Sequence, residues 1–241
     1  MATELSLSTM MFIDTSKCIG CKACQVSCKQ WHQLPVEPTT FTGSYQNPPN
    51  VSRDTFTMVK FTEFEREGKL KWLFFKNQCR HCLRPKCQRA CPKGIKRTKE
   101  GFIVFNENCI PANLKAPYKA LDDAKPDAEK NLGGACPFNV PRYNPDLGRY
   151  VKCDFCFDRL DSLNAGKYAS TYRDGCATTA CELTCPPQAI ITGTVGTITP
   201  IAKKRFNKVK KNLPYASLYW GKYGRTQVLY LLAEAPASYG L

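Results

Sequence analysis

The stretch that decides the fold runs Cys18-Ile-Gly-Cys21-Lys-Ala-Cys24-Gln-Val-Ser-Cys28, with the spacing C-x2-C-x2-C-x3-C. Three thiolates at three-residue intervals on a glycine-containing loop can each bind one iron of a cubane, while the fourth cysteine points elsewhere from the following helix. A zinc knuckle needs only two such cysteines. The pattern therefore predicts a [4Fe-4S] site and not a structural zinc ion.

Two modified copies of this pattern follow along the chain. They are Cys79-Arg-His-Cys82-x4-Cys87-x3-Cys91-Pro92 and Cys153-Asp-Phe-Cys156-x24-Cys181-x3-Cys185-Pro186. Both end in Cys-Pro, and the proline fixes φ and turns the chain away from the cluster. His81 lies inside the first copy, where neighbouring cysteines already supply the thiolates, so we interpret it as a packing or hydrogen-bonding histidine.

A fourth group is incomplete. A predicted strand in residues 101–105 leads to Cys109, but Ala112 stands where the second cysteine belongs, and the pattern resumes only at Cys136. The intervening residues 113–134 are polar and lack a clear period, so we expect a surface insertion there. This group keeps its first and fourth cysteines and has lost the middle two.

The nesting of the four groups predicts which cysteines share a cluster. In bacterial two-cluster ferredoxins the fourth cysteine of each group serves the other cluster, so the first group should pair with the last and the second with the third. The resulting ligand sets are Cys18, Cys21, Cys24 and Cys185; Cys28, Cys153, Cys156 and Cys181; and Cys79, Cys82, Cys87 and Cys136. We therefore expect three [4Fe-4S] clusters and an empty fourth site.

Three of the 15 cysteines remain outside these sets. Cys91 and Cys109 would be free thiols or a disulfide, and Cys176 lies in the long insertion of the last group with no partner group. None of the three is expected to bind iron.

The rest of the sequence offers no catalytic constellation. There is no G-x-G-x-x-G or P-loop, and the chain has only two histidines, His32 and His81. Three clusters without a substrate site predict an electron-transfer subunit, with the catalytic site on another polypeptide.

Length and composition narrow the remaining possibilities. The chain has 241 residues and a formal charge of +15, and its longest apolar run is Val228–Ala233, far below the roughly 18–20 residues of a membrane span. The first 13 residues lack a basic and a long apolar region, so we expect no secretory signal.

Six basic residues among positions 203–211 raise the possibility of nucleic-acid binding, but a solvated face or a docking arm on a partner is the favoured interpretation.

The predicted fold is α+β, with two ferredoxin-like iron-sulfur domains, one inserted in the other. The outer domain comprises residues 1–75 and 152–195, and the inner domain residues 76–151. A hairpin in residues 55–75 links them, residues 191–198 form a β-rich stretch, and residues 196–241 form an irregular basic extension that docks on the partner.

Four segments carry a resemblance to a known family over residues 10–195. They are Phe12–Trp31, Asn77–Cys82, Ala135–Tyr143 and Lys152–Arg159. They resemble the iron-sulfur β subunits of molybdenum or tungsten pterin oxidoreductases. The residues of the first cysteine group are most similar to those of formate dehydrogenase β subunits. The resemblance implies a catalytic α subunit with a bis-pterin guanine dinucleotide, its own [4Fe-4S] cluster and formate oxidation to carbon dioxide.

Membrane-bound members of that family carry four clusters and a C-terminal membrane helix, and this chain departs from both features. The resemblance then implies a soluble two-subunit complex that passes electrons to a diffusible carrier such as a c-type cytochrome. Such complexes are exported on the twin-arginine signal of the catalytic subunit, so we expect the periplasm, with the cytoplasm as the alternative. Two other functions stay open: a β subunit of a nitrate, dimethyl sulfoxide or polysulfide reductase, and a zinc-stabilised basic binding module.

Overall fold

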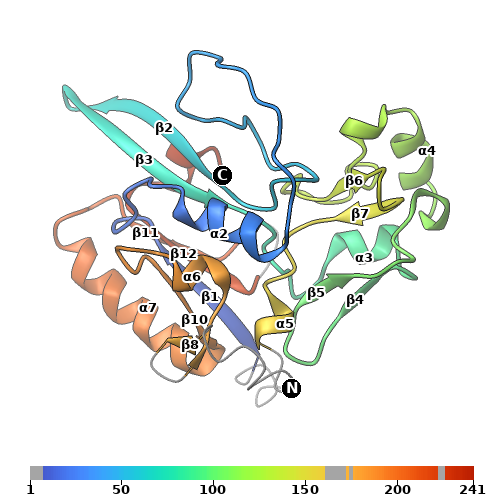
Figure 1. Cartoon of the computed structure of the whole chain (residues 1–241). Coiled ribbons are helices and arrows are strands. Elements are labelled where there is room, and N and C mark those ends of the chain that lie inside the picture. Colours follow the sequence, from blue (N-terminus) through green and yellow to red (C-terminus); the bar gives the residue numbers. More distant parts are fainter. Residues whose placement is uncertain (1–7, 161–171, 174–175, 222–225) are drawn as a thin grey trace.

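The computed structural model of the chain describes residues 8–160, 172–173, 176–221 and 226–241 (Figure 1). Its strands are β1 (Thr9–Asp14), β2 (Met58–Arg66), β3 (Lys69–Asn77), β4 (Ile95–Arg97), β5 (Ile103–Phe105), β6 (Arg142–Asn144), β7 (Arg149–Val151), β8 (Tyr172–Arg173), β9 (Cys176–Ala177), β10 (Ile190–Thr194), β11 (Ser217–Tyr219) and β12 (Val228–Leu232). Its helices are α2 (Ala23–Trp31), α3 (Lys86–Ala90), α4 (Tyr118–Asp123), α5 (Phe157–Leu160), α6 (Ala180–Leu183) and α7 (Val195–Lys210), with short 3-10 turns η1 (Pro111–Asn113), η2 (Asp127–Glu129) and η5 (Pro236–Tyr239). This mixture of small sheets and short helices confirms the expected α+β class.

The central sheet has the strand order β10-β1-β12-β11. Strand β12 runs parallel to β1, whereas β10 and β11 are antiparallel to their neighbours. Alternate residues of β1 enter two different cores: Met10 and Phe12 pack with α7, and Met11 and Ile13 pack on the opposite face. Burial on both faces explains why β1 and β12 are almost uniformly apolar.

The expectation of an irregular C-terminal extension is wrong. Helix α7 begins where the Thr194 hydroxyl accepts a hydrogen bond from the Thr197 N–H at 3.2 Å, so the predicted β-rich stretch in residues 191–198 is strand only as far as Thr194. Strands β11 and β12 then complete the central sheet. The apolar run at β12 has the high β-propensity of a buried strand and finds its partner in β1, at the other end of the sequence.

The predicted hairpin is confirmed as β2 and β3, paired antiparallel from Met58↔Asn77 to Arg66↔Lys69. Its two turn residues, Glu67 and Gly68, have φ values of 55° and 70°, the left-handed conformation that a tight hairpin turn requires. The hairpin's free end extends away from the body, while its base lies beside α2 (Figure 1).

The remaining part of the chain, residues 79–151, builds a smaller unit from α3, the β4–β5 pair and the β6–β7 pair (Figure 1). The segment 113–134, expected as a surface insertion, contributes to its core. Leu132 and Asp122 are fully buried, and Leu114 is nearly so. The sequence pattern did not show these residues, because they follow neither a helical nor a strand period.

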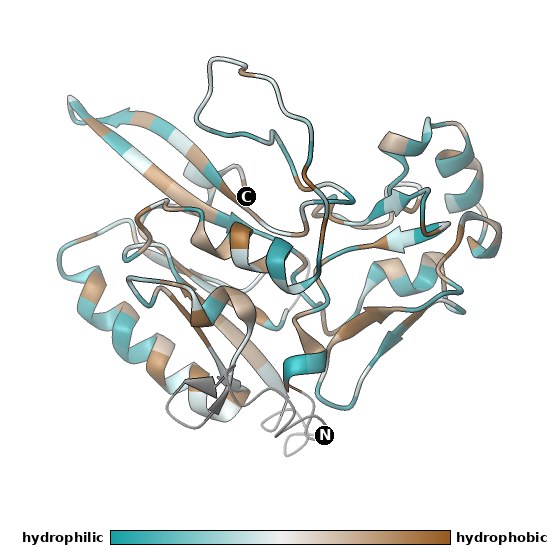
Figure 2. Cartoon of the chain, in the orientation of Figure 1, coloured by the Kyte–Doolittle hydropathy of each residue, from teal (hydrophilic) through white to brown (hydrophobic). Residues whose placement is uncertain are grey.

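Residues 203–210 of the basic run lie on α7, and Lys211 follows its last residue. The inner residues Ile198, Ala202 and Val209 of the helix face the sheet. The lysines of this run are exposed, and Figure 2 shows hydrophilic segments alternating with hydrophobic ones along the helix. Arg205 instead binds the buried carboxylate of Asp14, with 2.6 Å between Nε and Oδ2. Within the described ranges, every helix is too short or too polar to cross a bilayer.

Candidate iron-sulfur centres

The first predicted ligand set comes together at one end of the central sheet. Cys18 and Cys21 lie on the loop between β1 and α2, Cys24 is in the first turn of α2, and Cys185 follows α6. All four line a single apolar cavity. Burial, followed by the nearby thiols of Cys185 and Cys21, raises the pKa of Cys18.

The loop that carries this set requires a glycine. Gly20 has φ of 67°, and a Cβ there would lie 2.9 Å from the ring of Phe74. Strand β3 thus packs against the loop at a distance that only glycine allows.

The second set assembles between α2, α5 and α6. Cys28 is in the last turn of α2, Cys153 and Cys156 precede α5, and Cys181 is on α6, which packs against α2. Burial, followed by the charges of Cys153 and Cys181, raises the pKa of Cys28 well above its usual value.

The third set forms in the smaller unit. Cys79 and Cys82 precede α3, Cys87 is in its first turn, and Cys136 follows the insertion. Burial and the neighbouring thiols of Cys79 and Cys136 raise the pKa of Cys82 to about 12. The same two neighbours, after burial, raise the pKa of Cys87.

The buried sulfurs and the cations beside them fit metal clusters. Without metal these thiols would stay protonated, whereas iron ligation replaces the proton. Arg80, next to Cys79, is 2% exposed, and its Nε and Nη1 donors are buried without an acceptor. Such orphaned donors are costly unless an acceptor such as a cluster sulfur is present.

The two leftover cysteines of the incomplete fourth site lie side by side and are both free and fully buried. A hydrogen bond from Cys109 lowers the pKa of Cys91 to about 7. Leu114, Leu132 and Tyr150 pack around the pair. Apolar side chains thus surround these two thiols. Cys176 lies in β9, and its side chain is outside the described residues.

Tyr150 is anchored to the insertion by a buried polar contact. Its hydroxyl donates to Asp122, which also accepts the backbone N–H groups of Asn131 at 3.0 Å and Gly133 at 2.8 Å. This contact ties the middle of the insertion to β7.

Both ring nitrogens of His81 are engaged with the backbone. Nδ1 accepts the N–H of Ile103 at 3.0 Å, and Nε2 lies 3.2 Å from the carbonyl oxygen of Cys153. Burial, then the charge of Lys152, lowers the pKa of His81 well below its usual value. The histidine thus joins the two units as a neutral hydrogen-bonding group, the role expected from its position.

Sequence reasoning missed four polar residues beside the predicted ligands. They are His32, Lys76, Arg80 and Lys152. His32 Nε2 lies 3.4 Å from Asp154 Oδ1 and 4.0 Å from Cys156 Sγ. The sequence gives little signal for Lys76, because strand alternation puts it on the same face of β3 as the exposed Trp72 and the half-buried Phe74.

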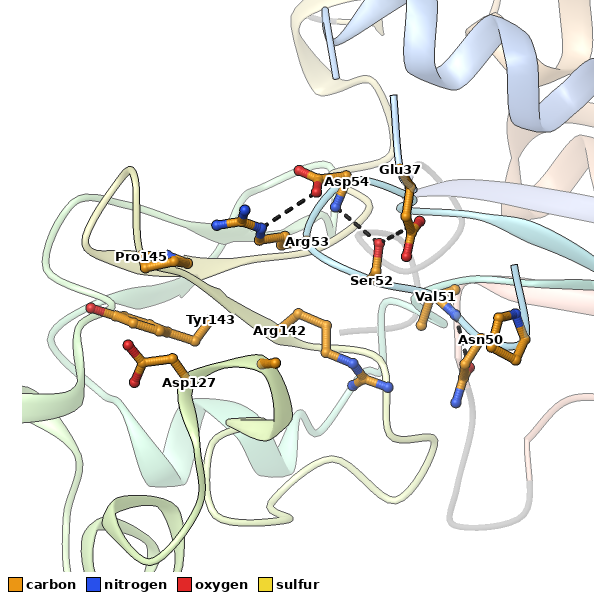
Figure 3. A pocket seen from close by; sticks show the side chains of 12 residues that line it. Glu37, Asn50, Val51, Ser52, Arg53, Asp54, Asp127, Arg142, Tyr143 and Pro145 are labelled. Atoms are coloured by element: carbon orange, nitrogen blue, oxygen red, sulfur yellow. Dashed lines mark hydrogen bonds and ion pairs between the residues drawn. The ribbon is translucent and has the colours of Figure 1, made fainter. Parts of the chain in front are cut away.

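A pocket of about 550 Å³ lies between the loop after α2 and the insertion (Figure 3). All of its charged lining residues are engaged with neighbours: Glu37 with Ser52 and Thr55, Arg53 with Asp54 and Asp146, Asp127 with Lys130, and Arg142 with Asn139.

Comparisons with known proteins identify iron-sulfur domains in this chain. Two models of a 4Fe-4S dicluster domain match residues 17–95 and 70–169. The formate dehydrogenase 2 subunit beta (cytochrome c-553) of Nitratidesulfovibrio vulgaris is 36% identical over 94% of both proteins. The protein belongs to the formate dehydrogenase beta (iron-sulfur) subunits.

Other relatives support the same family. The formate dehydrogenase subunit beta of Megalodesulfovibrio gigas is 32% identical over 97% of both proteins. The nitrate-inducible formate dehydrogenase iron-sulfur subunit of Escherichia coli is 35% identical over 92% of this chain and 67% of its own length. A subunit of the anaerobic dimethyl sulfoxide reductase of E. coli matches only 62% of this chain, at 30% identity.

The expected family, the ferredoxin-like iron-sulfur domains and the electron-transfer role are therefore confirmed. As a formate dehydrogenase beta subunit, the protein works with a catalytic subunit. Its dicluster domains identify the metal chemistry as iron-sulfur, so the zinc-stabilised module is not supported.

Proposed function

We propose that this formate dehydrogenase beta subunit holds three [4Fe-4S] clusters in a row and relays electrons from formate oxidation to a c-type cytochrome. The proposal is supported by one observation: the four cysteines of each predicted set lie close together. The sets are Cys18, Cys21, Cys24 and Cys185; Cys28, Cys153, Cys156 and Cys181; and Cys79, Cys82, Cys87 and Cys136. Each cluster, when bound, supplies a reversible one-electron redox centre.

The order of the row follows from neighbouring sulfurs. Cys181 of the second set lies close enough to Cys24 of the first to act electrostatically on its sulfur. Cys79 of the third set acts in the same way on the sulfur of Cys153 in the second. The second set thus lies between the other two.

One end of the row reaches the surface. Cys21 is the exposed member among the twelve predicted ligands, and Ile19 beside it is 59% exposed. An exposed ligand loop with an apolar neighbour suits a contact with a redox partner, since electron transfer needs close approach. We assign this end to the catalytic subunit and its pterin cofactor, Mo or W, and the third set to the acceptor side.

The acceptor and the compartment belong to the proposal as well. The N. vulgaris relative carries cytochrome c-553 in its name, which supports a c-type cytochrome as the acceptor, and a periplasmic location would bring the two proteins together. Cell fractionation of the native organism, with antibodies to this chain, would place it in the periplasm or overturn that part of the proposal.

The experiment that tests the relay is anaerobic purification with the catalytic subunit, followed by iron quantification and EPR before and after formate. We expect about twelve iron atoms assignable to this chain, four for each cubane, and cubane signals that appear with formate. Iron near sixteen would refute the empty fourth site. Clusters reducible by dithionite but not by formate would reject formate as the electron source.

A further inference from the structure

Lys76 is a buried cation without a carboxylate partner. It lies near the end of β3, and the residue is 3% exposed. The ammonium group donates hydrogen bonds to two neutral acceptors, Thr57 Oγ1 at 2.8 Å and Gln78 Oε1. Among the described residues, no Asp or Glu lies within ion-pair distance of it.

Such an arrangement is unfavourable by itself. Removing an ammonium ion from water is costly even after structural relaxation, and two neutral hydrogen bonds do not restore that loss. A lysine in this position normally loses its proton. A nearby negative charge must therefore compensate Lys76 in the working protein.

Within the described part of the chain, the cysteine ligands of two cluster sites supply the negative charge around Lys76 once iron has replaced their protons. Lys76 lines the cavity of the first set together with Cys18, Cys21, Cys24 and Cys185. Its charge also acts electrostatically on the sulfurs of Cys28 and Cys153 in the second set. The sulfurs of Cys24 in the first set, and of Cys153 and Cys181 in the second, lie close enough to act electrostatically on its ammonium group.

We propose that Lys76 is a fixed positive charge shared by the first and second clusters, and that it raises the reduction potential of both. The proposal rests on the cluster assignment given above. Reduction adds one negative charge to a cluster, and a cation in a low-dielectric interior stabilises that charge more strongly than the oxidised state. A single lysine between two centres would act on both in the same direction and keep their potentials close.

The third cluster site has different cations. The charge of Arg80 acts electrostatically on the sulfur of Cys82, and the charge of Lys152 acts on the sulfurs of Cys87 and Cys136. The effect of Lys76 should consequently be confined to two of the three clusters. This selectivity separates a local charge effect from a general disturbance of the fold.

The test uses three variants of the protein in complex with its catalytic subunit, purified anaerobically. K76Q removes the charge, and K76R keeps it. K69Q removes an equal charge from the exposed start of the same strand and is the matched control. EPR-monitored redox titration and iron quantification are the two measurements.

In K76Q we expect two cluster signals to titrate at more negative potentials and the third to stay unchanged. K76R and K69Q should titrate like the wild type. Loss of iron from K76Q alone, with K76R intact, would also support the proposal, because the charge would then be needed to hold the clusters.

Several results would overturn it. Unchanged potentials in fully iron-loaded K76Q would exclude a role for the charge, and an equal shift of all three signals would exclude a local one. Iron loss from both K76Q and K76R would show that the site needs the shape of lysine and not its charge. Failure of the relay itself would appear earlier, in the iron content and formate response of the wild-type complex.

Discussion

At the residue scale, two glycines with the same backbone conformation have different surroundings. Gly20 and Gly68 have φ of 67° and 70°, but a Cβ at Gly20 would meet the rings of Phe74 and Phe61, whereas nothing lies within 4 Å at Gly68. The first glycine is needed for packing as well as for its backbone angle, and the second only for its angle.

This difference predicts unequal effects of the same substitution. Gly68→Ala should cost about 1 kcal/mol, the penalty of a left-handed alanine, and leave the iron content unchanged. Gly20→Ala should cost roughly 3 kcal/mol, because the loop must also move away from β3. Anaerobic thermal unfolding and iron analysis would measure both. Equal unfolding midpoints for the two variants would contradict the close packing at Gly20.

The two leftover thiols give a second prediction at this scale. Cys91 and Cys109 lie in an apolar cluster that Cys87 of the third set borders, and they belong to none of the three ligand sets. The double variant Cys91→Ser, Cys109→Ser should therefore keep about twelve iron atoms and all three EPR signals. Cys87→Ser is the comparison, because this neighbour belongs to the third set and its loss should remove or convert one cluster. Loss of a cluster signal from the double variant would place iron at the fourth site.

At the element scale, α7 is tied into the fold by one ion pair. Asp14 at the end of β1 is 2% exposed, and Arg205 of α7 reaches it from the helix. Arg205→Ala should destabilise the protein by about 3 kcal/mol, since it leaves a buried carboxylate without its cation. The exposed neighbour Lys204 provides the control, and Lys204→Ala should change the unfolding midpoint little. Similar midpoints for both variants would mean that the apolar contacts of α7, and not this ion pair, hold the helix on the sheet.

The insertion offers a parallel case. Asp122 holds together α4, the turn at Gly133 and Tyr150. Asp122→Ala should cost about 3 kcal/mol because it leaves buried donors without an acceptor, whereas the exposed Asp123→Ala should be nearly neutral. Hydrogen exchange of residues 113–134, compared between the two variants, would show whether the loosening is confined to the insertion.

At the scale of the whole molecule, the clusters and the cores depend on each other. Each ligand set draws cysteines from segments far apart in the chain, and buried cations lie beside them. Removing iron with a chelator under oxidising conditions should thus loosen both units, since the buried charges lose their compensation. Limited proteolysis of iron-loaded and iron-free protein would measure this, and identical cleavage patterns would show that the fold stands without metal.

The sequence by itself determined the chemistry of this protein. Cysteine spacing is a local constraint, because three thiolates within seven residues can reach one cubane whatever the rest of the polypeptide does. The hairpin of β2 and β3 was equally readable, since its pairing is set by a two-residue turn and alternating side chains. The family resemblance came from the same local segments.

Only the tertiary structure decided how the pieces are arranged. The pairing of β12 with β1 joins Met11 to Val228, and no local pattern encodes a contact across that length of sequence. The same holds for Asp122, a polar residue that becomes buried because Tyr150 and two backbone N–H groups meet it from other segments. Lys76 is the clearest case, because only folding brings the cysteines of two separate groups around its charge.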